Sequence, residues 1–254
     1  MKKVIMAAAA ATLFVLPLSA NAAEDIHLPE QEWSFNGVFG KFDKQQLQRG
    51  FQVYREVCSA CHELKYIAFR NFEALGYSEA QIKVLAAEYE VEDGPDEFGD
   101  MFMRPAKASD YLPRLYANEA VARSMFNGAL PPDLSLMTKA RAGGPDYVYN
   151  LLLGYEEAPA DIELGDGMTY NKYFPGHQIA MVEQLFDDRV AYADETPATK
   201  EQLAKDVTTF LHWAAEPNLD ARHSMGIKVM LYTLLFTILA YLLKVRIWSR
   251  LEKK

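Results

Sequence analysis

The chain has only two cysteines, which stand three residues apart, and a histidine directly follows the second one. Cys58, Cys61 and His62 thus form a C-x-x-C-H motif, and it occurs once in the 254 residues. In an exported protein this motif is typical of c-type haem attachment, because the two thiols add to the haem vinyl groups and the adjacent histidine reaches the iron. The sequence therefore predicts one covalent haem c, held by Cys58 and Cys61, with His62 as an iron ligand.

Three other interpretations of the motif are less consistent with its surroundings. A thioredoxin-like dithiol needs a βαβ setting, whereas the residues around Cys58 have helical spacing. A structural zinc site needs further Cys or His ligands nearby, and the next histidine after His62 is His177. A disulfide between Cys58 and Cys61 would leave the adjacent histidine unexplained. Haem attachment accounts for all three residues.

The sixth iron ligand decides between electron transfer and ligand chemistry. A methionine or second histidine closes the site, and an open position permits small-molecule binding. Met181 follows an aromatic-rich loop at 170–176 that could cover a haem face, and His177 is its rival. His212 and His223 are expected to be hydrogen-bonded helix residues. The other methionines between residues 23 and 224 are Met101, Met103, Met125, Met137 and Met168.

Both ends of the chain carry membrane signals. Residues 1–22 combine two lysines, an alanine-rich apolar run and a small-x-small cleavage site, so they predict a signal peptide. The segment 229–243 carries no charge, and residues 225–248 are predicted to cross the membrane once. The basic residues around 249–254 favour a cytoplasmic tail. These signals predict a single-pass protein of the bacterial inner membrane, with residues 23–224 in the periplasm.

The charge of the chain is concentrated in that exported part. The whole chain has a formal charge of −9, while residues 1–22 carry +2 and residues 225–254 carry +5, which leaves −16 for residues 23–224. Such an acidic surface argues against a nucleic-acid partner, which needs basic side chains, and favours a basic protein partner. Seven carboxylates gather between Glu88 and Asp100, in what we expect to be a loop around Gly94-Pro95.

Apolar spacing predicts a mainly α-helical fold with few strands. Helices are expected over 43–64, 78–90, 117–127, 145–154 and 199–215. Asp43 and Ser78 are expected to cap the first two of them. Residues 155–180 have no period and are rich in Gly, Pro and Tyr, so they predict a long loop, which in a compact domain is usually functional.

Beyond the haem motif, the chain resembles the cytochrome c1 family along almost its whole length after the signal peptide. The matching stretches are Arg49–Tyr54, Met101–Pro105, Asn127–Ser135, Tyr173–Gly176, Ile179–Met181 and Trp213–Pro217. The resemblance implies that His62 and Met181 are the axial iron ligands. It also implies that Arg123 lies near the haem propionates and that Pro131 and Pro132 line the haem pocket.

The resemblance also implies a function. Members of this family are subunits of the quinol:cytochrome c oxidoreductase, the bc1 complex of respiratory or photosynthetic quinol oxidation, together with cytochrome b and the Rieske iron–sulfur protein. They take an electron from the Rieske protein and pass it to a c-type cytochrome, and the chain alone catalyses nothing. The alternatives are a free-standing membrane-anchored electron shuttle and a haem enzyme or gas sensor with a labile sixth ligand.

The sequence departs from the family pattern at two places. Met125-Phe126 stands where the family usually has Ala-Asn, beside the expected haem pocket. Val182-Glu183-Gln184 replaces the usual proline-rich stretch after the methionine ligand. Without prolines we expect a looser methionine loop, and we expect the Glu183 carboxylate to lower the haem potential.

Overall fold

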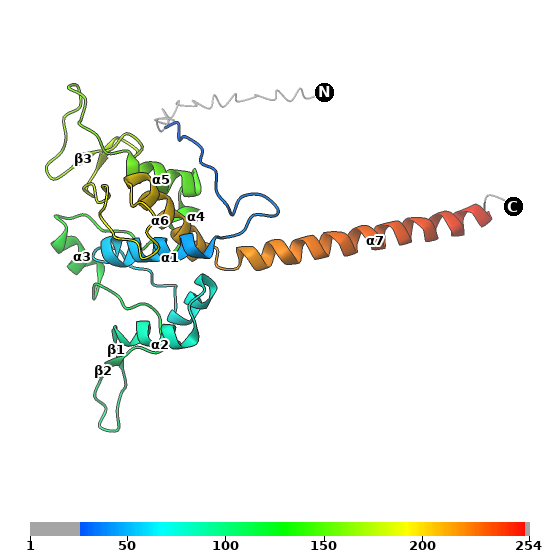
Figure 1. Cartoon of the computed structure of the whole chain (residues 1–254), viewed down its shortest axis with the longest axis horizontal. Helices are drawn as coiled ribbons and strands as arrows, with labels where there is room; N and C mark the ends of the chain where they lie inside the picture. The colour runs from blue at the N-terminus through cyan, green and yellow to red at the C-terminus, as the bar shows by residue number, and fades with distance from the viewer. Residues whose placement is uncertain (1–25, 252–254) are drawn as a thin grey trace, which may run out of the picture.

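A computed structural model describes residues 26–251, so the predicted signal peptide at 1–22 lies outside the described residues. The fold is mainly α-helical, as expected, and a long C-terminal helix extends away from the domain (Figure 1). Its helices are α1 (Lys44–Val53), η1 (Tyr54–Cys58), η2 (Phe69–Leu75), α2 (Glu79–Ala87), α3 (Glu119–Met125), α4 (Met137–Ala140), α5 (Gly144–Leu153), α6 (Lys200–Ala215) and α7 (Leu219–Leu251). Two short hairpins add β1 (Glu90–Asp93) with β2 (Phe102–Pro105), and β3 (Thr169–Tyr170) with β4 (Gln178–Ile179).

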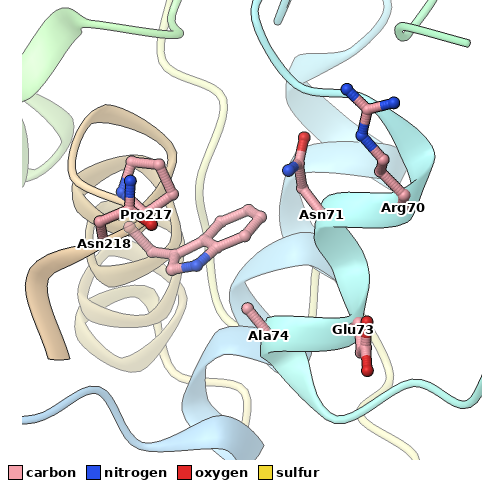
Figure 2. A pocket seen from close by; sticks show the side chains of 7 residues that line it. Arg70, Asn71, Glu73, Ala74, Pro217 and Asn218 are labelled. Atoms are coloured by element: carbon pink, nitrogen blue, oxygen red, sulfur yellow. The ribbon is translucent and has the colours of Figure 1, made fainter. Parts of the chain in front are cut away.

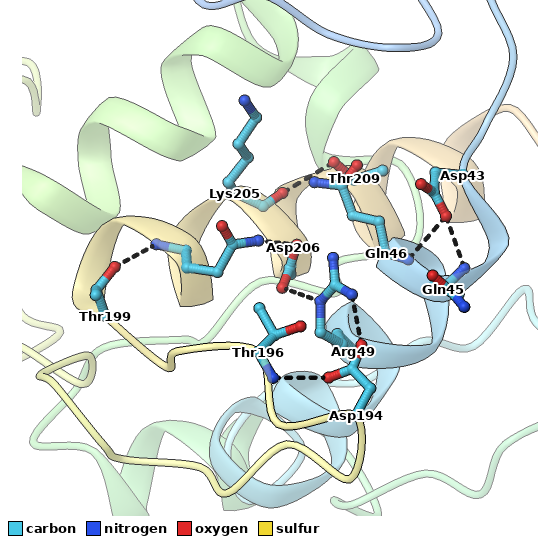
Figure 3. A network of polar contacts seen from close by, with 11 residues as sticks. Asp43, Gln45, Gln46, Arg49, Asp194, Thr196, Thr199, Lys205, Asp206 and Thr209 are labelled. Atoms are coloured by element: carbon cyan, nitrogen blue, oxygen red, sulfur yellow. Dashed lines mark hydrogen bonds and ion pairs between the residues drawn. The ribbon is translucent and has the colours of Figure 1, made fainter.

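The core of the domain is built on the crossing of α1 and α6. A Cβ at Gly50 would lie 2.1 Å from the backbone oxygen of Asp206, so the two helices meet at a distance that only glycine allows. Beside this contact the Arg49 guanidinium donates to Asp206 and to Asp194, each at 2.8 Å (Figure 3). Asp206 is fully buried, and the ion pair compensates its charge.

The segment before the haem motif begins as predicted but ends earlier. Asp43 caps α1 by accepting from the backbone N–H of Gln45 at 2.8 Å. The helix then widens into the π-helical turn η1, which ends at Cys58. The predicted extension to residue 64 is wrong, because the chain leaves the helical path after Cys58 and the carbonyl of His62 accepts from the Tyr54 hydroxyl instead.

The acidic run between Glu88 and Asp100 is not a plain loop. Ser78 caps α2 as predicted, but this helix ends at Ala87, and β1 then pairs antiparallel with β2. The hairpin stands out from the body of the domain, away from the axis of α7 (Figure 1). The Arg104 guanidinium stabilises the hairpin by pairing with Asp93 and Asp110. This pairing, which links residues on both strands, explains why a carboxylate-rich segment adopts regular structure.

The remaining elements follow the predicted pattern with small differences. The helices expected at 117–127, 145–154 and 199–215 are α3, α5 and α6. The long segment 155–180 is largely irregular, as expected, but contains the two-residue strands β3 and β4. The short helices η2 and α4 were not predicted, because neither is long enough to establish a helical period.

The C-terminal helix α7 is the one described helix that is long and apolar enough to cross a membrane. Its 33 residues give a length of about 50 Å, which exceeds the roughly 30 Å of a hydrocarbon core. The helix begins at Leu219, six residues before the span predicted at 225–248, so its first turns lie outside that predicted span. Only Glu216, Pro217 and Asn218 separate α6 from α7.

Candidate haem site

The C-x-x-C-H motif forms one tight turn at the end of η1. The backbone N–H groups of Cys61 and His62 both donate to the carbonyl of Cys58, at 3.1 and 2.9 Å. Two tyrosine hydroxyls fasten the turn from outside, since Tyr54 donates to the carbonyl of His62 at 2.9 Å and Tyr116 to that of Cys61 at 3.1 Å. The turn therefore brings Cys58, Cys61 and His62 together with a fixed backbone, as attachment of one prosthetic group requires.

His62 is oriented by the loop that carries the two predicted pocket prolines. Its Nδ1 lies 2.8 Å from the carbonyl oxygen of Pro132, which can only accept, so Nδ1 carries the proton. The other nitrogen, Nε2, then keeps its lone pair for a metal, in the arrangement usual for histidine ligands. Burial lowers the pKa of His62 from its ordinary value, which keeps the imidazole neutral at neutral pH.

Asp133 fixes this proline loop against the haem motif. Its carboxylate accepts from the backbone N–H of Lys65 at 2.9 Å and of Ser135 at 3.0 Å. One residue further, the N–H of Leu134 donates to the carbonyl of Glu63 at 2.8 Å. The sequence analysis did not predict this role of Asp133. Its place directly after two prolines was a signal, because prolines have no backbone N–H to donate and a nearby polar side chain can hold the loop instead.

The two thiols do not resemble a reactive dithiol. Burial raises the pKa of the Cys58 thiol to about 12, and the neighbouring Cys61 adds to this effect. Redox-active C-x-x-C motifs have a lowered cysteine pKa instead. The surroundings of Cys58 therefore fit a thiol that becomes a thioether. Together with the helical residues before the motif, they argue against a thioredoxin-like site.

Arg123 and the two unusual residues beside it lie at the end of α3. The Arg123 guanidinium is exposed and donates to the carbonyl of Gly128 at 3.1 Å, so it braces the turn that leads to Pro131. Phe126 packs edge-on against Tyr116, with ring centroids 6.0 Å apart, and so reaches the tyrosine that holds Cys61. Met125 remains 64% exposed, an apolar side chain that a large planar group could cover.

Met181, the predicted sixth ligand, lies two residues after β4. Its side chain is half-buried, and its backbone carbonyl accepts a hydrogen bond from the Tyr155 hydroxyl at 3.0 Å. This bond fastens the Met181 segment to the residue that follows α5 by two positions, and the assignment of Met181 as the sixth ligand stays a prediction.

The departure after Met181 contains an ion pair that the sequence did not reveal. The Glu183 carboxylate pairs with the Lys200 ammonium at the start of α6. The expected effect of Glu183 on the haem potential stays a prediction. Together with the Tyr155 bond, this pair restrains the segment on both sides of Val182, where the family usually has prolines.

The rival ligands have other partners. His177 stacks on Tyr170 with centroids 5.6 Å apart and has its Nδ1 3.4 Å from the carbonyl of Asn171. His212 on α6 contacts the Thr138 hydroxyl at 3.1 Å, as expected of a hydrogen-bonded helix residue. His223 on α7 lies 2.8 Å from the carbonyl of Gly40. Met101 and Met103 belong to the acidic hairpin, at its exposed outer part.

A cavity of about 310 Å³ lies away from these residues, between η2 and the link from α6 to α7 (Figure 2). Arg70 and Asn71 line it on one side, and Pro217 and Asn218 line it on the other. None of the predicted haem residues contributes to its lining. We therefore define the candidate site by the C-x-x-C-H turn and the residues that hold it.

The residues present fit a haem group of the c type. Two cysteines share one turn, and the adjacent neutral histidine is aimed by a backbone carbonyl. With a mainly helical domain and one candidate membrane span among residues 26–251, these features fit the class of membrane-anchored c-type cytochromes. A family model described as "Cytochrome C1 family" matches residues 33–251, and the chain belongs to this family.

Individual relatives agree over most of the chain. It is 48% identical to "Cytochrome c1" of Rhodospirillum rubrum over 239 residues, 88% of each protein. It is 49% identical to "Cytochrome c1, heme protein, mitochondrial" of Schizosaccharomyces pombe over 231 residues, which are 91% of this chain and 75% of that protein. It is also 46% identical to "Cytochrome b/c1" of Bradyrhizobium diazoefficiens, of which the match covers 35%.

Proposed function

We propose that this chain is the haem c subunit of a bc1-type quinol:cytochrome c oxidoreductase. It accepts an electron from a Rieske iron–sulfur protein and passes it to a c-type cytochrome, and it catalyses no reaction alone. The observation that carries the proposal is the His62 imidazole, which Pro132 orients beside the two cysteines in a member of the cytochrome c1 family. The names of two relatives, "Cytochrome b/c1" and "Cytochrome b-c1 complex catalytic subunit", support cytochrome b as a partner.

The protein's own residues hold the group and keep its surroundings constant. Cys58 and Cys61 attach one haem c covalently, and His62 and Met181 are its axial ligands. The haem supplies a one-electron iron couple when bound. Pro131 and Pro132 close the histidine side, and Arg123 at the nearby turn offers a positive charge to the propionates. A site closed on both sides favours electron transfer over small-molecule binding.

The junction between α6 and α7 favours a fixed subunit over a free-standing shuttle. Glu216 forms ion pairs with Lys139 on α4 and with Arg222 on α7. In the first turn of α7, the Asp220 carboxylate accepts from the backbone N–H of Phe42 at 3.2 Å. A shuttle needs a flexible linker to carry its haem between partners, whereas here the helix is fastened to the domain.

The same junction supports the predicted placement. Residues 225–248 cross the inner membrane of a bacterium once, residues 23–224 form the haem domain in the periplasm, and residues 249–254 stay in the cytoplasm. The contacts of Asp220, Arg222 and His223 extend the domain into the first turn and a half of α7. These contacts hold the haem domain at one height above the membrane surface.

The acidic hairpin is the surface we assign to the basic c-type cytochrome. The carboxylates of Asp93 and Asp96 are used internally, by Arg104 and by backbone N–H groups of the turn. Glu92, Glu97 and Asp100 are exposed, and the same hairpin exposes two apolar side chains, Phe98 (82% exposed) and Met101. Charges of this kind raise the rate of association, and the apolar residues between them provide contact once the partner has docked.

Purification of the intact complex tests the proposal. Membranes are solubilised in mild detergent, and the assembly is isolated through a tag on this chain. We expect cytochrome b and an iron–sulfur protein to be recovered in amounts equal to the tagged chain. Isolation of the haem-loaded chain without either protein would contradict a bc1 subunit and support the shuttle.

A further inference from the structure

The segment that carries Met181 is held by the side chains of Tyr155 and Lys200. Tyr155 follows α5 and pairs with Asn171 in an isolated β-bridge, so its backbone is fixed. From there its hydroxyl donates to the carbonyl of Met181 at 3.0 Å.

The second restraint acts at the other end of the same short segment. Lys200 begins α6, and its ammonium pairs with Glu183, two residues after Met181. Its backbone N–H donates to Asp187 at 2.8 Å, and the N–H of Asp188 donates to the carbonyl of Ala198 at 2.8 Å. The segment from Met181 to Asp188 is therefore attached to the first turn of α6, one of the two helices that form the core.

We propose that Tyr155 and Lys200 are positioning residues that fix the backbone around Met181, in place of the missing prolines, and thereby keep its sulfur on the haem iron. This inference rests on the proposed function, because it takes Met181 as the sixth ligand. Prolines would restrain such a loop by limiting the unfolded chain. Here a hydrogen bond and an ion pair restrain the folded loop directly, so the restraint can be removed one side chain at a time.

Substitutions at the two positions separate restraint from charge. Tyr155→Phe removes one hydrogen bond without changing any charge. Lys200→Gln removes the ion pair and leaves Glu183 negative, whereas Glu183→Gln removes the same pair and leaves Lys200 positive. Loosening acts in the same direction in both charge variants, but the electrostatic effect on the potential has opposite sign, since a negative charge stabilises ferric iron.

The experiment uses the haem-loaded full chain in detergent, with Tyr111→Phe as the matched control because the Tyr111 side chain is 53% exposed. Three properties are measured: the weak red band of a methionine–ferric haem bond, the midpoint potential, and the rate of carbon monoxide binding to ferrous haem. We expect Tyr155→Phe to speed carbon monoxide binding about fivefold, as loss of one neutral hydrogen bond implies. Lys200→Gln should lower the potential more than Glu183→Gln, and Lys200→Arg should restore wild-type behaviour.

The outcomes distinguish the inference from the function on which it rests. If wild type shows the methionine band, and Tyr155→Phe and Lys200→Gln match Tyr111→Phe in all three measurements, the positioning role is refuted while the proposed function stands. If wild type lacks the band, or Met181→Leu retains it, the ligand assignment fails and the inference fails with it. Covalent haem content, measured on denatured protein, confirms that each variant has matured.

Discussion

The two sides of the predicted haem site are held in different ways. On the histidine side, four backbone groups of the turn and its flanks are bound by Tyr54, Tyr116, Asp133 and Leu134. On the methionine side, Tyr155 and Lys200 hold the chain on either side of Val182. His62 thus belongs to a turn with several backbone contacts, whereas the Met181 segment depends on single side-chain contacts. We therefore expect Met181, the proposed sixth ligand, to be released more easily than His62.

The largest expected effect follows from removing the attachment itself. Cys58→Ala or Cys61→Ala should reduce covalent haem to near background, because each thiol forms its own bond to the group. Haem that remains on the polypeptide in a denaturing gel is the measurement. Ser59→Ala, within the same turn, is the control and should retain the haem. Full covalent haem in both cysteine variants would refute attachment by this motif.

The second prediction concerns the proline loop that orients His62. Asp133→Ala removes the acceptor for two backbone N–H groups, those of Lys65 and Ser135, and should cost about 1–3 kcal/mol of unfolding free energy. Thermal unfolding of the haem-loaded chain, followed by haem absorbance, measures this change. Asp161→Ala, at an exposed position of the long loop, should leave the midpoint temperature within error. Equal effects of the two substitutions would show that the proline loop does not depend on Asp133.

The third prediction concerns the acidic hairpin, the surface that we assign to the electron-accepting cytochrome, and it is tested by neutralising its carboxylates. Neutralising Glu92, Glu97 and Asp100 together should slow electron transfer to a basic cytochrome c roughly tenfold at low salt, because complementary charge steers association. The difference should shrink as ionic strength rises. Stopped-flow rates over a salt series provide the measurement. A rate that responds neither to these substitutions nor to salt would remove the hairpin from the docking surface.

The smallest expected effect concerns the membrane junction. Hydrogen bonds and charge from Lys139 and Arg222 lower the pKa of Glu216. Its stabilising contribution is therefore complete above the ordinary glutamate pKa and is lost as the pH falls through the lowered value. We expect Glu216→Gln to lower the unfolding free energy by about 1 kcal/mol at neutral pH. In acid, the variant and the wild type should have the same unfolding free energy. Unfolding measured across pH checks this, and a constant difference at all pH values would contradict it.

The chemistry of the histidine side is local, so its residues could be predicted from the sequence. Cys58, Cys61 and His62 are neighbours in the chain, and their spacing predicts haem attachment, while the helical periods at 145–154 and 199–215 predict α5 and α6. The turn at Cys58 was not predicted, because the helix was expected to continue to residue 64. The contacts that were missed join distant residues: Asp133 and Lys65 are 68 positions apart, Tyr155 and Met181 are 26 apart, and Glu183 and Lys200 are 17 apart. No local pattern encodes such pairs.

Two ion pairs could not be predicted from the sequence for the same reason. The loop expected around Gly94-Pro95 is present, but the strands on either side of it and the pairing of Arg104 with Asp93 become visible only in three dimensions. Glu183 and Lys200 are likewise adjacent only in the folded chain. In both cases the sequence showed a charge without its partner.

The proposed haem of this chain should relay electrons from a quinol-oxidising complex to a soluble cytochrome. The most direct test is rapid mixing of quinol with the purified complex, with the haem of this chain followed by absorbance. We predict that it is reduced within one turnover, that it is reoxidised on addition of a basic c-type cytochrome, and that ferrous haem resists carbon monoxide. Haem that stays oxidised with quinol, or that binds carbon monoxide readily in the wild-type complex, would contradict the claim and indicate a haem enzyme or sensor.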